Sequence, residues 1–290
     1  MPELPEVETV KNGLNRLLKN KKIVSVKFDW PKGFPNSEAD VNKFLIGSQI
    51  IHTRRRGKSL IIQLSSGYCL VIHLKMTGQL VIRGDKQFGA GHPSDSLVGP
   101  LPDRSTRVIF SLDDESKLFF NDQRKFGWIR LIPEVEVDHL DFMKRLGPEP
   151  LSADFKPSEF RSRVRRRRNS SIKATILDQS VLAGVGNIYA DESLWMAKIH
   201  PSSLSGTLSD AKLNLLFNSI KEVLKKSIDL GGSTDRNYVD AEGKRGSYLE
   251  FANVFRREGK MCNRCGSEIL KIRVATRGTH YCPKCQRKTK

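Results

Sequence analysis

The chain has 290 residues, a length that favours about two domains over a single hydrophobic core. Its 50 Lys and Arg residues against 32 Asp and Glu residues give a net charge of +18, which predicts a polyanionic partner. Nucleic acid is the commonest such partner, and an anionic membrane surface is the alternative. No run of about 18 apolar residues and no apolar stretch behind a basic N-terminus occurs, so the sequence predicts neither a membrane span nor a signal peptide.

The first predicted element is an amphipathic helix that begins at Pro5. Its apolar residues recur at helical spacing, although Gly13 disfavours a helix there. Beyond it, short β-branched and aromatic segments separated by turn residues predict an antiparallel sandwich or barrel-like sheet. The predicted strands span residues 22–30, 59–65, 68–74, 78–83, 107–112, 117–121 and 127–132. The stretch 84–106 is rich in Gly, Pro, Ser and Asp, and its length predicts a mobile or functional loop.

After Pro133 the pattern becomes helical. The predicted helices span about 136–145, 157–168, 172–179, 187–198 and 208–229, and the sequence Gly-Pro-Glu-Pro at 147–150 indicates a domain boundary. Strands first and helices afterwards are typical of an α+β chain with two domains. A last segment, 260–290, carries four cysteines.

The first eight residues, MPELPEVE, allow two interpretations. Removal of Met1 would leave Pro2 as an N-terminal secondary amine beside the carboxylate of Glu3. Because an α-amino group titrates near ~8, part of it is an unprotonated nucleophile at neutral pH and can form a Schiff base with a sugar carbon. Alternatively, Pro5 simply starts a helix whose dipole favours acidic residues in the first turn.

The cysteine pattern predicts a metal site. Cys262 and Cys265 form one Cys-x2-Cys pair, and Cys282 and Cys285 form a second pair after sixteen intervening residues. This spacing fits one tetrahedral, structural Zn²⁺ on a β-hairpin, while two disulfides or an iron–sulfur site are the alternatives. Four thiolates leave no position for a catalytic water. The fifth cysteine, Cys69, is predicted to be a buried small residue.

Three further motifs suggest contacts with nucleic acid. The glycine turn before Asn187 predicts a helix start, with Asn187 as the N-cap, whose N–H groups could bind phosphate. The basic runs at 54–58, which ends in Lys58, and at 161–168, which has six arginines, could also bind phosphate, or they could be solvated faces. Met76, Arg124 and Phe126 fall at predicted hairpin tips and could insert into a base stack, or they could belong to the core.

Taken together, these motifs resemble one family. The N-terminal PELPEVE, the GVGNIY junction at 184–189 and the paired C-terminal cysteines occur in the same order in bacterial formamidopyrimidine-DNA glycosylase, also called DNA-(apurinic or apyrimidinic site) lyase. The resemblance covers essentially the whole chain and implies a β-sandwich beside a helical domain that contains a helix–two-turn–helix and a zinc finger. The implied divisions are a catalytic sandwich at 1–133, a hinge helix at 134–150, the helix–two-turn–helix domain at 151–232, a lesion-capping loop and linker at 233–259 and the zinc finger at 260–290.

The resemblance also implies roles for single residues. Pro2 would attack C1′ of the damaged nucleotide, Glu3 would act as acid and base at the sugar, and Glu6 would support the amine. The residues implied to bind DNA are Lys58, His73, Asn187 and Arg277, with Lys173 and Glu192 near the site in roles the motif does not specify. Met76, Arg124 and Phe126 would fill the gap left by the flipped base, with Arg124 facing the orphaned cytosine.

The implied function is bifunctional base excision repair. Oxidised purines, namely 8-oxoguanine and formamidopyrimidines, would be excised from double-stranded DNA through a Schiff base on Pro2, followed by β- and δ-elimination. The enzyme would be a monomer with one structural Zn²⁺. It would act in the bacterial cytoplasm, near the nucleoid. The alternatives are an endonuclease VIII-like enzyme for oxidised pyrimidines and a zinc-containing damage-binding protein without catalysis. Leu4 and the turn at 124–127 favour the purine enzyme.

Two positions depart from the family pattern. Ser105 stands where the family often has a histidine before a threonine, so a contact there is expected to be lost. Phe255 and Arg256 replace the usual Tyr-Gly ahead of the zinc finger, which adds a charge close to the DNA.

Overall fold

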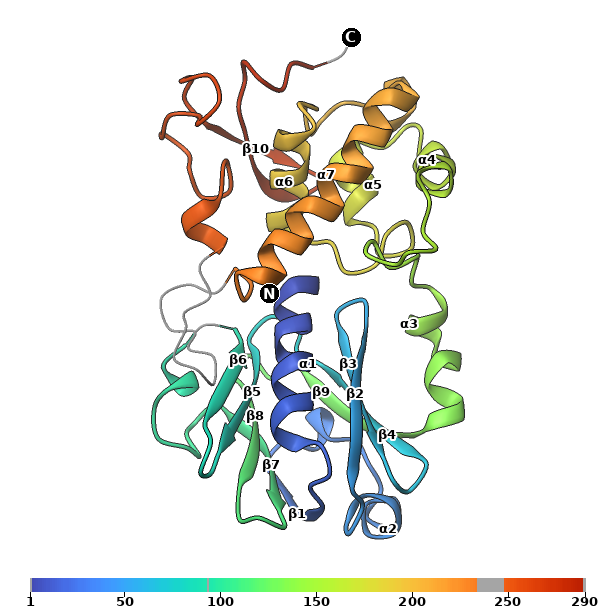
Figure 1. The fold of residues 1–290 in the computed structure, drawn as a ribbon, viewed down its shortest axis with the longest axis vertical. Coiled ribbons are helices and arrows are strands. Elements are labelled where there is room, and N and C mark those ends of the chain that lie inside the picture. The colour runs from blue at the N-terminus through green and yellow to red at the C-terminus, as the bar shows by residue number, and fades with distance from the viewer. Residues whose placement is uncertain (1, 93, 234–247, 289–290) are drawn as a thin grey trace. The chain divides into compact units, whose positions relative to one another are not determined.

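The computed structural model describes residues 2–92, 94–233 and 248–288, and these form two compact units with an α+β composition (Figure 1). Unit 1 contains the described residues up to 144 together with 230–233. Unit 2 contains residues 145–229 and 248–288. The first boundary falls after Lys144, inside the segment where the sequence predicts a hinge helix.

Unit 1 begins with α1 (Leu4–Leu18) and continues with strands joined by short helical turns. The strands are β1 (Ile23–Phe28), β2 (Ile50–Arg56), β3 (Ser59–Leu64), β4 (Tyr68–His73), β5 (Gly78–Arg83), β6 (Phe88–Gly91), β7 (Thr106–Leu112), β8 (Lys117–Asp122) and β9 (Trp128–Pro133). The short helices are η1 (Pro31–Gly33), α2 (Glu38–Asp40), η2 (Val41–Leu45), η3 (Asp95–Leu97), η4 (Glu134–His139) and α3 (Asp141–Lys144).

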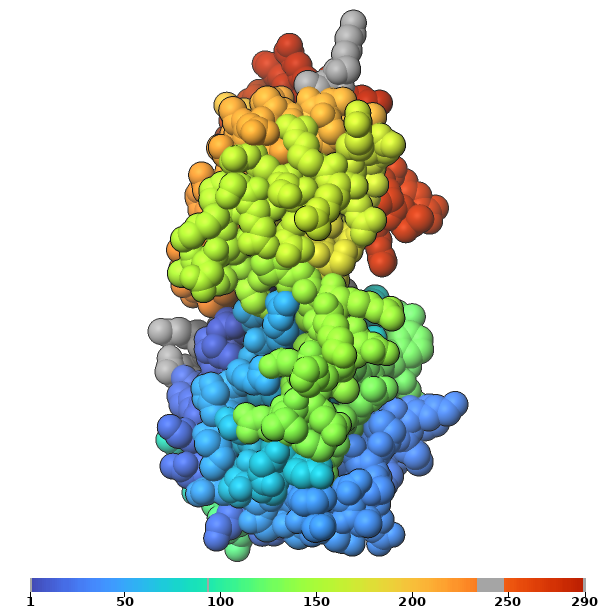
Figure 2. Space-filling view, turned by 90° about the vertical axis from the view of Figure 1, so that its right-hand side faces the viewer, coloured from blue at the N-terminus to red at the C-terminus, as the bar shows by residue number. Residues whose placement is uncertain are grey.

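The strands of unit 1 form two antiparallel sheets that enclose one core. One sheet has the order β1-β7-β8-β5-β6 and the other has the order β2-β3-β4-β9. Alternate residues of both sheets, such as Leu60, Ile62, Leu80 and Phe110, are buried in a shared cluster. In Figure 2 the green segment with η4 and α3 lies over part of the blue four-stranded sheet, which agrees with the contacts of η4 to β4 and β9.

Helix α1 closes the sandwich along one side. It contacts β2 and β6, which are edge strands of the two different sheets (Figure 1). An edge strand exposes unpaired backbone groups, so a covering helix protects both edges at once. Gly13 allows this packing, because a Cβ built at that position would lie 2.1 Å from the ring of Phe88 on β6.

All seven predicted strands are present, but β2 and β6 were missed. The first contains three consecutive arginines and has the character of a surface charge run, and the second has the sequence FGAG. The prediction of a loop throughout 84–106 was therefore wrong at 88–91, where β6 pairs with β5, and η3 follows. Cys69 is buried on β4, as predicted.

Unit 2 is built around a nearly all-buried helix. Its elements are α4 (Pro157–Arg165), α5 (Ile172–Leu177), α6 (Asn187–Met196), η5 (Ser205–Thr207), α7 (Asp210–Asp229), η6 (Tyr248–Phe251), β10 (Leu270–Val274) and β11 (Arg277–Tyr281). Helix α6 contacts α5, α7 and β11 and is buried from Tyr189 to Trp195. Phe155, Phe160 and Phe217 join α4 to α7 through edge-on and tilted ring contacts. Among the described residues, no helix combines the length and apolar character needed to cross a membrane.

Candidate functional site

The N-terminal end of α1 is fixed by a network of carboxylate contacts. Pro2, Glu3 and Glu6 are buried, and Glu3 is the N-cap residue of α1. Glu6 Oε2 accepts a hydrogen bond from the backbone N–H of Glu3 at 2.7 Å, and Glu6 Oε1 accepts one from the N–H of Ser233 at 2.7 Å. The two oxygens of Glu6 therefore join the start of the chain to the segment that follows α7.

Lys58 lies in the two-residue turn between β2 and β3. Arg56 pairs with Ser59 across that turn, and Gly57 has φ +56°, a value that glycine adopts without strain. His73 is the cross-strand partner of Ser59 on β4. Lys58 and His73 are consequently neighbours at one end of the four-stranded sheet.

His73 is held as a neutral donor. Burial, with smaller contributions from the charges of Lys75 and Lys58, lowers the pKa of His73 to about 3. Nδ1 of His73 accepts a hydrogen bond from the backbone N–H of Lys75 at 3.0 Å. In the neutral ring the proton is therefore on Nε2, and this N–H can donate to an anion without a charge on the ring.

The three candidate insertion residues lie on two adjacent connections. Met76 is in the β4–β5 loop, Arg124 and Phe126 are in the β8–β9 turn, and all three side chains are exposed. The guanidinium of Arg124 lies 4.9 Å from the centre of the Phe126 ring. Because β4, β8 and the starts of β5 and β9 meet in register, both connections lie at the same end of the sandwich as Lys58.

Asp122, which the sequence analysis did not select, organises these connections. One of its oxygens accepts from the N–H groups of Phe126 at 2.8 Å and Gly127 at 2.6 Å. The other accepts from the hydroxyl of Thr77 and from the N–H of Arg124 at 3.2 Å. An Asp at the first position of a tight turn is a known turn signal, and it could have identified Asp122.

In unit 2, Asn187 is the first residue of α6, and Gly186 is the N-cap, so the prediction of Asn187 as the N-cap was wrong. A glycine has no side chain to cap the helix, and the Asn187 side chain instead crosses to the hairpin. Its Nδ2 donates to the carbonyl oxygen of Gly278 at 3.0 Å. Arg277, adjacent to Gly278, is exposed at the start of β11, and the turn residues are Ala275 and Thr276, both with positive φ.

Lys173 and Glu192 are buried, so neither reaches a DNA phosphate in this structure. Lys173 Nζ contacts Asp191 Oδ1 at 2.6 Å and Thr279 Oγ1 at 2.7 Å, and the lysine is 0% exposed. Glu192 accepts hydrogen bonds from the backbone N–H groups of residues 253, 254 and 255. Lys173 and Glu192 therefore make internal contacts of unit 2 and lie next to the residues predicted to bind DNA.

Most of the arginine run at 161–168 is used within unit 2. Arg161 and Arg165 contact Asp210, Arg163 contacts Glu159, and Arg167 contacts Asp178. The yellow-green segment with α4 forms much of the face of unit 2 seen in Figure 2. These ion pairs favour the interpretation of the run as a solvated structural face.

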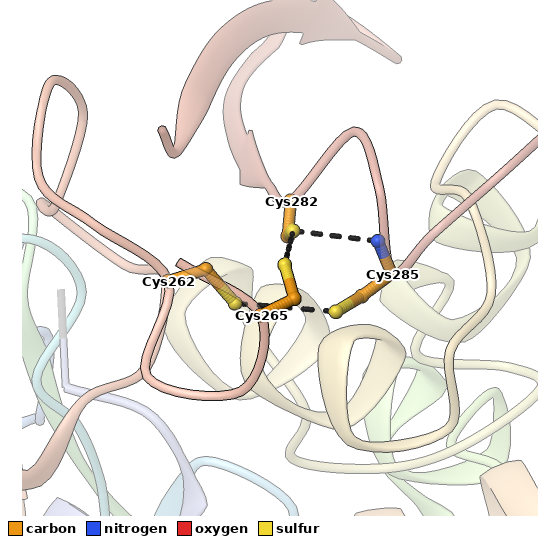
Figure 3. A group of neighbouring side chains, drawn as sticks. All are labelled: Cys262, Cys265, Cys282 and Cys285. Carbon is orange, nitrogen blue, oxygen red and sulfur yellow. Dashed lines mark hydrogen bonds between the residues drawn. The ribbon is translucent and has the colours of Figure 1, made fainter. Parts of the chain in front are cut away.

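The four C-terminal cysteines form a metal-binding geometry (Figure 3). Their sulfur atoms all lie within 4.8 Å of one another, and the pairs Cys262–Cys285 and Cys265–Cys282 are separated by 4.0 and 3.4 Å. A tetrahedron with Zn–S bonds of about 2.3 Å has S–S edges of about 3.8 Å, so the residues fit Zn²⁺. Trp195 Nε1 donates to Cys262 Sγ at 3.4 Å, as a donor to a metal-bound thiolate does. The site is a closed, structural zinc site.

Two departures from the family pattern acquire physical explanations. Ser105 is buried, and its hydroxyl donates to Asp103 at 2.7 Å, so it is turned into unit 1. Arg256 has φ +56°, which explains why a glycine suits this position. The Phe255 ring packs against His280 with centroids 5.1 Å apart.

The fold and sites together define a class of protein. A β-sandwich with a buried proline at position 2, a helical unit and a four-cysteine zinc site characterise a zinc-finger DNA glycosylase. Residues 1–129 match the family model of the formamidopyrimidine-DNA glycosylase N-terminal domain, 146–238 match its H2TH domain, and 259–287 match the zinc finger found in FPG and IleRS. The chain belongs to the formamidopyrimidine-DNA glycosylase family and is a DNA glycosylase of base excision repair.

Individual relatives agree with this assignment. The chain is 42% identical to formamidopyrimidine-DNA glycosylase of Pelotomaculum thermopropionicum over 288 residues, with 99% of each chain covered. It is 41% identical to that of Chloroflexus aurantiacus, with 99% of this chain and 98% of the relative covered. The wild-type Lactococcus lactis enzyme in complex with N7-benzyl-Fapy-dG-containing DNA has a TM-score of 0.87 and 37% identity, with 99% of this chain and 100% of that chain covered.

Removal of zinc is expected to unfold the hairpin. Cys265→Ala or a strong chelator should reduce bound zinc from one ion per chain and abolish DNA binding, because metal ligation supplies folding free energy to such a small segment. Atomic absorption and a gel-shift assay measure the two effects. Cys69→Ala, which changes a cysteine outside the cluster, should retain the zinc. DNA binding by zinc-free protein would show that the metal is dispensable.

The partly buried His73 is expected to make unit 1 less stable in acid. The unfolded chain binds a proton at this residue near pH ~6.5, whereas the folded pKa is about 3. Between these values the unfolded state binds more protons, so the stability contribution is fully present above pH ~6.5 and is lost as the pH falls. Denaturant midpoints at pH 4 to 8 should therefore vary less in His73→Gln. The control is His52→Gln at an exposed site on β2, and an equal slope in all three proteins would contradict the assignment.

Proposed function

We propose that this glycosylase excises oxidised purines, 8-oxoguanine and formamidopyrimidines, from double-stranded DNA with Pro2 as the nucleophile. The observation that carries the proposal is the fixed, buried N-terminal end of α1, where Glu6 accepts a hydrogen bond from the N–H of Glu3, the residue that follows Pro2. Reaction requires removal of Met1, because the nitrogen of Pro2 is otherwise an amide. Met1 lies outside the described residues.

The chemistry follows from a secondary amine. The Pro2 nitrogen attacks C1′, the bond from C1′ to the base breaks, and the sugar ring opens to leave an iminium. The iminium carries a positive charge without further protonation and withdraws electrons from C2′. Loss of a C2′ proton then expels the 3′ phosphate, and a second elimination expels the 5′ phosphate, which leaves a one-nucleotide gap with phosphates at both ends. Glu3 serves as acid and base at the sugar, and Glu6 supports the amine.

The DNA contacts are assigned to side-chain donors and cations, of which Arg277 is exposed and Lys58, His73 and Asn187 are partly buried. Lys58 and the neutral Nε2–H of His73 bind phosphates beside the lesion from unit 1, and Asn187 and Arg277 bind the same strand from unit 2. Met76, Arg124 and Phe126 fill the void left by the extruded nucleotide, and Arg124 faces the cytosine opposite. Extrusion costs a few kcal/mol of unstacking, which the inserted side chains offset in part. The excess positive charge supplies affinity that depends on salt.

Each segment of the chain has a separate role in the proposed function. Residues 1–133 form the catalytic sandwich, 134–150 a hinge, 151–232 the helix–two-turn–helix domain and 260–290 the zinc finger. The segment 233–259 caps the lesion and links the parts, and its residues 234–247 lie outside the described residues. The substrate is DNA with damaged bases or abasic sites, as in the Lactococcus lactis enzyme bound to abasic-site DNA, and the enzyme acts as a monomer in the cytoplasm, at the nucleoid.

Borohydride trapping tests the nucleophile. Protein without Met1 should form a covalent complex with duplex containing 8-oxoguanine opposite cytosine, and peptide mass spectrometry should place the adduct on Pro2. A form that retains Met1 is the control and should give no adduct. Absence of an adduct on both 8-oxoguanine and abasic duplexes would refute the proposal. Trapping on thymine glycol alone would instead assign the enzyme to oxidised pyrimidines.

The two connections held by Asp122 are expected to matter for base extrusion. Asp122→Asn replaces one acceptor oxygen by a donor, so contacts to the β8–β9 turn are lost and about tenfold or more of the excision rate should be lost on duplex DNA. Trapping on single-stranded abasic DNA, which requires no extrusion, should be nearly unchanged. Asp114→Asn is the matched control, because Asp114 holds the Ser116 turn between β7 and β8 in the same way. Equal effects of the two variants would contradict this role.

A further inference from the structure

We propose that Glu8 and Arg55 form a positioning pair that sets the Lys58 turn relative to the N-terminal amine. This inference rests on the proposed roles of Pro2 and Lys58. Arg55 Nε donates to Glu8 Oε2 at 2.7 Å, and Arg55 Nη1 donates to the carbonyl oxygen of Gly57 at 3.0 Å. One guanidinium therefore connects the helix that carries the amine to the turn that carries the lysine.

The contact to Gly57 gives the pair its specific effect. The Gly57 carbonyl and the Lys58 N–H belong to the same planar peptide unit, so a bond to that oxygen fixes the orientation of the backbone at Lys58. An ordinary surface ion pair contributes little to structure. Here the side chains of Arg55 and Glu8 are only 9% and 18% exposed, so the contact is largely shielded from solvent.

Glu8 is kept in the ionised form that this contact requires. Burial alone would raise the pKa of Glu8, but the hydrogen bonds and charges of Lys11 and Arg55 outweigh burial and hold the pKa below its ordinary value. Lys11 contacts Glu8 Oε1, which leaves Glu8 Oε2 for Arg55. Within the part of the chain that the structure describes, the charged groups that act on this carboxylate are the cations Lys11 and Arg55.

A second contact between the same two elements shows what the charged pair adds. The side chain of Asn15 exchanges two hydrogen bonds of 2.7 Å each with the backbone of Thr53. Asn15 lies seven residues after Glu8 on α1, and Thr53 lies two residues before Arg55 on β2, so both contacts use the same helix face and the same edge strand. The neutral contact already attaches helix to strand, and the charged one extends the attachment to the end where Pro2 and Lys58 lie.

A displacement of about 1 Å between a nucleophile and a substrate-binding group can cost about 100-fold in rate. The pair is therefore expected to act on the rate of chemistry more than on affinity. Glu8→Gln and Arg55→Lys should each slow single-turnover excision at least tenfold, while the Kd for duplex with a stable abasic analogue changes less than threefold. Lysine cannot reproduce the two-armed geometry of arginine although it keeps the charge.

Asn15→Ala is the matched control. It should lower the melting temperature of the protein as much as Glu8→Gln does, yet leave the excision rate close to that of the wild type. If Asn15→Ala slows excision equally, the effect belongs to general attachment of α1, and the proposal is overturned.

A charge-reversed protein separates the ion pair from the turn contact. Glu8→Arg combined with Arg55→Glu restores an opposite-charge pair and should recover thermal stability. A glutamate at position 55 cannot donate to the Gly57 carbonyl, so the excision rate should remain low. Recovery of the rate would show that the ion pair alone suffices and would overturn the role of the turn.

A double-mutant cycle identifies the route of the effect. If the pair acts through Lys58, Glu8→Gln should slow excision much less in a Lys58→Ala background than in the wild type. Additive losses would overturn the inference. Borohydride trapping of the wild type separates a failure of the proposed function from a failure of the positioning pair. If the wild type gives no adduct, the proposed function itself is contradicted. If the wild type and Glu8→Gln are both trapped at equal rates, only the role of the positioning pair is contradicted.

Discussion

The carboxylate of Glu6 is the contact on which the active end of this protein depends. A chain terminus normally frays, because few backbone bonds and little burial hold it. In the proposed mechanism Pro2, the residue next to the start, has to be fixed closely enough to meet a sugar carbon. Glu6 achieves this with both oxygens, one bonded to the N–H of Glu3 and the other to the N–H of Ser233. The contact with Ser233 spans most of the sequence, so the terminus is ordered by tertiary structure as well as by the helix that follows it.

The same helix couples the stability of the sandwich to the geometry of the site. Helix α1 covers the edge strands β2 and β6 of two different sheets, and β2 leads directly into the turn with Lys58. The register of the strands brings that turn, His73 and the two insertion connections to one end of the sandwich. A packing change in the helix, such as any side chain at Gly13, is therefore transmitted to the candidate catalytic residues.

Local patterns predicted most of the elements and the metal site, because each depends on residues close together in the chain. The helical period placed α1 and α7, and the spacing of two cysteine pairs predicted the zinc site. Partners far apart in sequence were not predictable. Arg55 looked like part of a basic run, yet it lies in a strand and bonds to Glu8, and Asp122 was passed over although it organises both insertion connections. Lys173 matched a motif near the site, but only the fold shows that its ammonium group forms an ion pair with a buried carboxylate.

Unit 2 contains a buried ion pair beside the residues proposed to contact DNA. Lys173 and Asp191 are both 0% exposed. Because desolvation of two charges is costly, such a buried ion pair usually contributes little net stability. The ion pair instead serves to position the hairpin. Lys173 Nζ and Asn187 Nδ2 both donate to the carbonyl of Gly278, at 3.3 and 3.0 Å, and Asp191 accepts from the N–H of His280 at 2.9 Å. The hairpin is thus fixed to two helices through these contacts, and the four-cysteine cluster lies on the same segment of the chain. A short hairpin is only marginally stable alone, so the proposed contact of Arg277 with a phosphate depends on the anchoring of the hairpin at both places.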